Sequence, residues 1–140
     1  MTRHRTVSAT IADLRGCPGQ VEMTLLTPEG VVAVEVALSA PTSHALAHVH
    51  ALHGHAHGCD SAQDVHVGLL LRAIGALGGR AQCIVIRAGR HPAFWLCLRR
   101  GAAVYRLDLG ILDAICLLAC QRVPVEVEVS SDADRAAPED

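Results

Sequence analysis

The stretch that decides the fold runs from Tyr105 to Val127 and reads YRLDLGILDAICLLACQRVPVEV. Polar and apolar residues alternate up to Asp108, which is typical of a strand with one buried face. The next segment, Ile111–Cys120, is apolar around its whole circumference except for Asp113, as in a helix buried between other elements. A second alternating run, Val125–Val129, closes the stretch. These 23 residues therefore predict a strand, a buried helix and another strand.

Short runs rich in β-forming residues, separated by turns that contain Gly or Pro, fill much of the remaining chain and favour antiparallel hairpins. The expected strands are Thr6–Leu14, Val21–Thr27 and Val31–Leu38, as a three-stranded meander, and then Gln82–Ala88, Phe94–Arg99 and Ala103–Asp108. Helices are expected over Thr42–His53 and Val65–Leu77, the second ended by Gly78-Gly79, with a loop over Gly54–Asp60 between them. This order predicts one α+β domain, a mixed and mostly antiparallel sheet with two to three packed helices.

Composition sets further bounds. The chain has 140 residues, 51% of them hydrophobic, which is enough for a single core over residues 1–129. The tail Ser130–Asp140 holds four acidic residues and one Arg, a net charge of −3, and is expected to be disordered. Because the whole chain is −2, the other 129 residues are +1, far from the basic footprint of a dedicated nucleic-acid binder.

The same composition bears on location. No apolar run reaches the roughly 18 residues of a membrane span, so no membrane partner is expected. The first ten residues, MTRHRTVSAT, lack the apolar core of a secretory signal. A cytoplasmic location with reduced cysteines is therefore expected.

The stretch at Tyr105–Val127 resembles the signature of the bifunctional nuclease family, in which a strand leads into Asp-x-x-x-Ser-Asp-Ala-Ile, an apolar helix and a Pro-containing strand. The matching residues are Asp108, Asp113, Ala114, Ile115 and Pro124. The resemblance covers roughly residues 6 to 128 at the level of element order. Three polar positions differ: the family's Ser falls on Leu112, its Glu on Thr42, and its Thr-His pair on His66-Val67.

The resemblance implies a metal-dependent nuclease that acts on RNA and DNA, forms a homo-oligomer, and uses Asp108, Asp113 and His66 as catalytic residues. Carboxylates suit Mg²⁺ or Mn²⁺, and such a cation polarises a phosphate and lowers the pKa of the attacking water. Asp113 also fits a structural role, since an acidic residue in the first helical turn complements the helix dipole. The competing interpretation is a non-catalytic, oligomeric binding or regulatory domain on the same scaffold.

Histidine is concentrated in one segment. Six of the nine histidines lie between His44 and His57, in the sequence HALAHVHALHGHAH. Imidazoles at this density bind Zn²⁺ or Ni²⁺, and two of them four residues apart on a helix project side by side. The candidate metal ligands are His44, His48, His53, His55 and His57. The alternative is a solvated, composition-biased segment without a role in metal binding.

Overall fold

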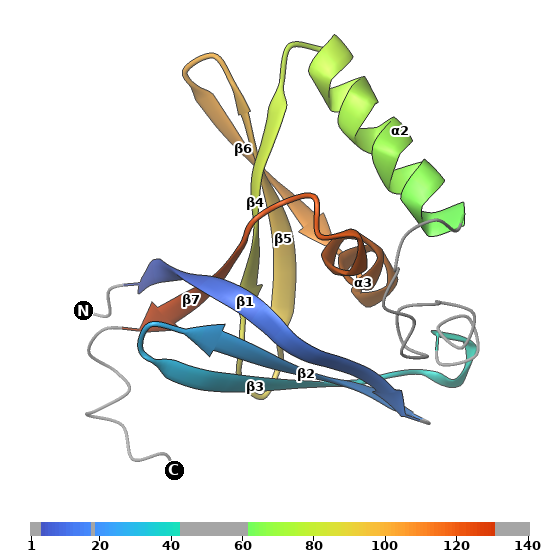
Figure 1. Ribbon diagram of the computed structural model, residues 1–140, viewed down its shortest axis with the longest axis vertical. Coiled ribbons are helices and arrows are strands. Elements are labelled where there is room, and N and C mark those ends of the chain that lie inside the picture. Colours follow the sequence, from blue (N-terminus) through green and yellow to red (C-terminus); the bar gives the residue numbers. More distant parts are fainter. Residues whose placement is uncertain (1–3, 18, 43–61, 131–140) are drawn as a thin grey trace.

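The computed structural model describes residues 4–17, 19–42 and 62–130. Within them, seven strands form one mixed sheet in the order β3-β2-β1-β7-β4-β5-β6, in which only β4 and β7 are parallel neighbours (Figure 1). The elements are β1 (His4–Cys17), β2 (Gln20–Thr27), β3 (Gly30–Ala37), α2 (Ala62–Ala76), β4 (Arg80–Arg87), β5 (Ala93–Arg100), β6 (Ala103–Leu109), α3 (Ile111–Cys120) and β7 (Val125–Ser130).

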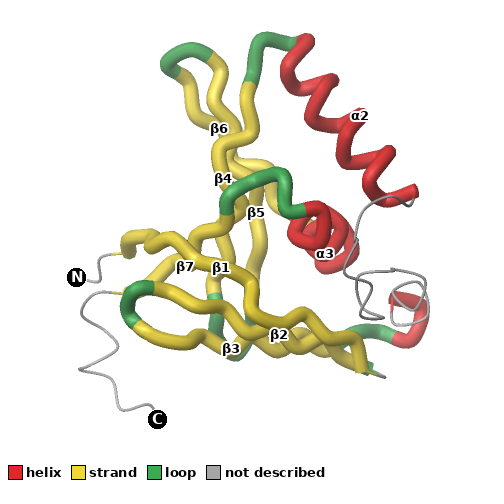
Figure 2. The backbone as a smooth tube through the Cα atoms, in the orientation of Figure 1, coloured by secondary structure: helices red, strands yellow, loops and turns green. Residues whose placement is uncertain are grey.

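Strand β1 joins two arms of this sheet. Its first half pairs with β7, and from Thr10 onward it pairs with β2, with an irregularity in this second pairing between Ile11 and Asp13. A bulge of this kind bends a strand and increases its twist. In Figure 1 the β1–β2–β3 arm and the β4–β5–β6 arm consequently run in different directions, and α3 lies in the angle between them. Short turns close the β2–β3 and β5–β6 hairpins (Figure 2).

The main core fills this angle. Strand β2 alternates in burial, and Val21, Met23 and Leu25 point into the core. Leu96 of β5 and Ile115 of α3 belong to the same cluster and are fully buried. Burial of apolar side chains on one face of each strand and most of α3 is the main source of stability for such a domain.

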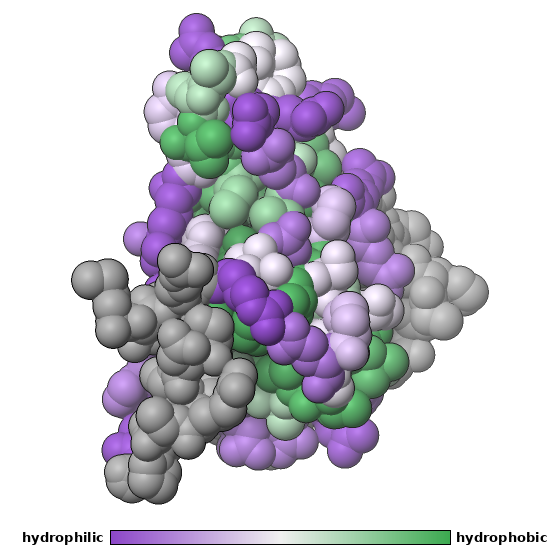
Figure 3. Space-filling model, turned by 90° about the vertical axis from the view of Figure 1, so that its left-hand side faces the viewer, coloured by the Kyte–Doolittle hydropathy of each residue, from purple (hydrophilic) through white to green (hydrophobic). Residues whose placement is uncertain are grey.

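The helix-free face of the β4–β5–β6 arm carries a smaller cluster of Cys83, Val85 and Trp95. The Trp95 ring lies between two guanidinium groups, with Arg106 Cζ 3.9 Å and Arg87 Cζ 5.3 Å from the ring centroid. These cation–π contacts cover an aromatic ring that neither α2 nor α3 covers. Figure 3 shows the side of the molecule turned away from the helices, where hydrophilic residues run in strips between hydrophobic ones.

The α+β class and the mixed, mostly antiparallel sheet are confirmed. Helix α3 has the predicted bounds, and α2 ends as predicted, because Gly78 adopts φ +83° and the Gly79 N–H donates to Ile74 O at 2.9 Å. The expected helix over Thr42–His53 lies outside the described residues, apart from Thr42, as do the loop and most of the acidic tail. No helix in the described ranges is long and apolar enough to cross a membrane.

Candidate functional site

The junction between β6 and α3 holds the two predicted catalytic aspartates. β6 ends at Leu109, and Gly110 serves as the N-cap, its carbonyl accepting a 2.9 Å hydrogen bond from the Ala114 N–H. Asp113 then lies in the first turn of α3, where its negative charge interacts favourably with the helix dipole. The structure thus has Asp108 and Asp113 flanking a strand–helix junction, as the sequence predicts.

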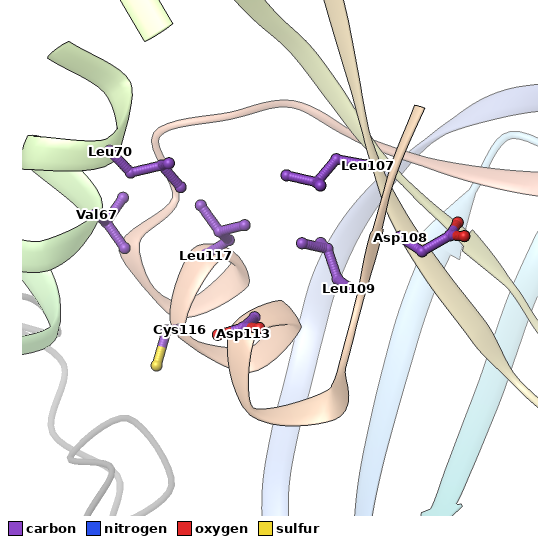
Figure 4. Close-up of a pocket in the computed structure, with 8 residues that line it drawn as sticks. All are labelled: Val67, Leu70, Leu107, Asp108, Leu109, Asp113, Cys116 and Leu117. Atoms are coloured by element: carbon purple, nitrogen blue, oxygen red, sulfur yellow. The ribbon is translucent and has the colours of Figure 1, made fainter. Parts of the chain in front are cut away.

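The two carboxylates point in different directions. Asp108 is opposite Trp95 in the β5–β6 register, so its side chain lies on the helix-free face of the sheet. There Arg106 Nε donates to Asp108 Oδ1 at 2.8 Å. Asp113 lies on the helix side of β6, and Figure 4 shows its carboxylate and that of Asp108 on opposite sides of the strand. The structure does not bring the pair together around one point.

A pocket of about 380 Å³ lies between α2, α3 and β6. Its lining residues come from all three elements: Val67, Leu70, Leu107, Asp108, Leu109, Asp113, Cys116 and Leu117. Figure 4 shows Val67 and Leu70 of α2 on one side, Leu107 and Leu109 of β6 on the other, and Leu117 of α3 between them. Asp108 borders the pocket through the strand that forms its wall, while its carboxylate points away.

The pocket exists because α2 packs chiefly against α3 and leaves a gap beside the outer strand. Val67 is buried, whereas Leu70 is 37% exposed and Leu107 is 44% exposed. An open, apolar-walled recess of this kind is where small-molecule ligands bind most often. The sequence does not predict this pocket, because its patterns give α2 and β6 only as a helix and a strand. The available signal was the adjacent pair Leu69-Leu70, since one narrow helix face cannot bury both.

The other predicted site residues lie elsewhere. His66 is on α2, next to Val67, and its side chain is not among those described. The candidate ligands His44, His48, His53, His55 and His57 are outside the described residues. In the part of the chain that is described, no three His, Cys, Asp or Glu side chains form a group suited to a metal ion.

A second polar feature lies on the helix-free face. Cys83 and Cys97 are directly opposite each other in the β4–β5 register, with Glu126 of β7 beside them. Burial, and then the neighbouring Cys97 and Glu126, raise the pKa of the Cys83 thiol to about 12. Because the thiolate is the reactive form, this cysteine is inert at neutral pH, as a structural residue would be.

Comparison with known proteins adds no identification: no family model matches the chain, and no curated protein matches its sequence.

Proposed function

We propose that this protein is a binding domain whose pocket between α2, α3 and β6 takes up an apolar group of a ligand. The observation that carries the proposal is the lining of that pocket, in which five of the eight residues are aliphatic. Leu70 and Leu107 remain partly exposed there, and covering apolar surface gains about 25 cal/mol per Å². The volume of about 380 Å³ falls in the range of small-molecule sites.

The charge of the lining indicates the class of ligand. Asp108 and Asp113 are the charged residues among the eight, and no Arg is among them. Asp113 is exposed near the mouth, so its carboxylate attracts a positive group and repels a negative one. A neutral or cationic ligand with an apolar portion fits this arrangement better than an anion does.

Fluorescence titration tests the proposal. The probes are N-phenyl-1-naphthylamine, a neutral dye, and 8-anilinonaphthalene-1-sulfonate, an anionic one. The neutral dye should bind more tightly. Leu70→Asp should weaken its binding about tenfold or more, equivalent to about 1.4 kcal/mol. The matched control is Leu69→Asp, because Leu69 is the neighbouring residue and does not line the pocket. Equal effects of the two substitutions, or preference for the anionic dye, would refute the proposal.

Metal-dependent nuclease activity is a second candidate, supported by the strand–helix junction that Asp108 and Asp113 flank. In such an enzyme a Mg²⁺ or Mn²⁺ ion held near Asp113 would supply the positive charge that a phosphate requires. Asp113→Asn should then abolish cleavage of RNA or DNA that depends on Mn²⁺ and is blocked by EDTA. Asp13→Asn is the matched control, since Asp13 is an exposed residue of β1 paired with Arg15. Wild-type protein that cleaves no faster than buffer would eliminate this candidate.

A further inference from the structure

Strand β6 forms an open edge of the sheet. It is the last strand in the order and pairs only with β5 among the described elements. Its side chains from Ala103 to Asp108 are exposed, and Val104, Tyr105 and Leu107 are 58%, 51% and 44% exposed. Natural edge strands usually carry Lys, Pro or a bulge that prevents pairing with another strand. β6, with the sequence AVYRLDL, has no Pro, its register with β5 is regular, and its two charged residues, Arg106 and Asp108, are of opposite sign.

The hairpin geometry determines which backbone groups of β6 face outward. Arg100 and Ala103 close a two-residue turn in which Gly101 has φ +61°, so this pair exchanges both backbone hydrogen bonds. Hydrogen-bonded and non-hydrogen-bonded pairs alternate along an antiparallel ladder. The N–H and C=O groups of Val104, Arg106 and Asp108 therefore point away from β5, toward the open edge.

We propose that a second copy of this chain pairs with β6 in an antiparallel manner, about a two-fold axis at Leu107. In this register Arg106 of each copy is directly opposite Asp108 of the other, and both residues present outward-facing backbone groups. The two copies of Leu107 meet at the axis, and Tyr105 is opposite the second copy's Leu109. The result is a continuous sheet through both copies, with α2 and α3 of each copy on the same side.

Charge complementarity favours a second copy of this chain as the partner of β6, and it favours this register of pairing. Arg106 and Asp108 are on the same face of β6 and two residues apart, so a two-fold axis at the residue between them pairs opposite charges twice. Moving the axis by one residue in either direction places Arg106 opposite Arg106, or Asp108 opposite Asp108. The other edge strand, β3, has Glu35 as its one charged residue, so the same operation there pairs no opposite charges. The pairing does not depend on any ligand in the pocket.

Disulfide trapping tests the register. Leu107 would form a non-hydrogen-bonded pair across the axis, where the Cα atoms are about 4.5 Å apart, within reach of a disulfide. Leu107→Cys should therefore give a covalent dimer under mild oxidation, with peptide mapping to distinguish the new bond from those of the native cysteines. Tyr105→Cys is the matched control. Its two copies would be four residues apart along the strands, about 13 Å, and should not be linked. Equal linkage of both variants would overturn the register.

A charge-swap cycle tests the partner. In sedimentation velocity, wild-type protein should be a dimer, and Asp108→Arg and Arg106→Asp should each weaken it about tenfold or more. The double variant R106D/D108R should restore the dimer to within about threefold, because the opposite charges are again paired. Thermal melting verifies that each variant is folded. A wild-type monomer at about 100 μM, or a double variant as weak as the single ones, would overturn the proposal.

Discussion

Leu117 of α3 offers the sharpest test of how the helix is packed, because this side chain is 3% exposed and borders both the core and the pocket. Truncation of a buried Leu to Ala costs about 2–5 kcal/mol, depending on the cavity that remains. At Leu117 the vacated volume would merge with an existing open pocket. We therefore expect Leu117→Ala to lower the free energy of unfolding by about 2–3 kcal/mol. Leu117→Asp adds the desolvation of a carboxylate that has no cationic partner on α3, several kcal/mol more. That sum approaches the entire 5–15 kcal/mol of a typical domain.

Urea unfolding followed by the fluorescence of Trp95, the single tryptophan, measures these differences. Leu69→Asp is the control for the same chemical change at an exposed helical position, and we expect it to cost about 1 kcal/mol or less. The deficit of Leu117→Asp should diminish toward about pH 4, because the introduced carboxyl becomes neutral. A cooperative Leu117→Asp protein within about 1 kcal/mol of wild type would show that the α3 packing described above is wrong.

Two further predictions concern Cys83 and the His-rich segment. Because the pKa of the Cys83 thiol is raised from 9.0 to about 12, the unfolded chain releases this proton at a lower pH than the native protein does. The contribution of Cys83 to stability should thus be constant below about pH 9 and decrease by up to about 1.4 kcal/mol per pH unit between pH 9 and pH 12, a slope that Cys83→Ala should remove. The segment His44–His57 is expected to bind Ni²⁺ or Zn²⁺ at micromolar strength without a role in folding. The absence of a heat of binding in a calorimetric titration near neutral pH would contradict metal binding. A large fall in melting temperature when a chelator is added would contradict the claim that the metal has no role in folding.

The local elements of this fold could be predicted because their signals are local. Helix α3 has the predicted bounds, since Gly110 precedes a helix that is apolar except for Asp113, and Gln121 ends it in the left-handed conformation with φ 54°. The hairpins follow from turn residues such as Gly30 and Gly101, whose positive φ angles glycine adopts without strain. The ends of the strands differ from the prediction by a few residues. Strand β1, for example, extends to Cys17 because it pairs with one strand along its first half and with β2 along its second half.

The order of the strands in the sheet could not be predicted from local signals of this kind. The parallel pairing of β4 with β7 joins residues about 40 positions apart, Ile84 with Val125, and no local pattern encodes that partner. Strand β1 pairs with both β7 and β2, and this double pairing depends on the irregularity near Asp13. The sequence does not mark that irregularity with a Gly or Pro. Such long-range pairings are decided by the packing of the whole core.

The candidate site was predicted only in part, although one signal was available. Alternation along β6 places Asp108 and Arg106 on one face and Leu107 on the other. Because α3 lies on the Leu107 side of β6, a carboxylate at position 108 points away from Asp113 on that helix. The pair Leu69-Leu70 indicates apolar surface of α2 that stays outside the core, but the place of the pocket could not be predicted, since it depends on how α2 packs against α3.

The position of a bound ligand is the most direct test of the proposed function. Methyl groups of Val, Leu and Ile can be followed by ¹H–¹³C NMR during titration with N-phenyl-1-naphthylamine. We predict saturable shifts of the methyl groups of Leu70, Leu107 and Leu117, and unchanged positions for exposed Val31 and Leu26 on the opposite arm of the sheet. Shifts spread equally over all exposed aliphatic residues, or confined to Val31 and Leu26, would contradict binding in the pocket between α2, α3 and β6.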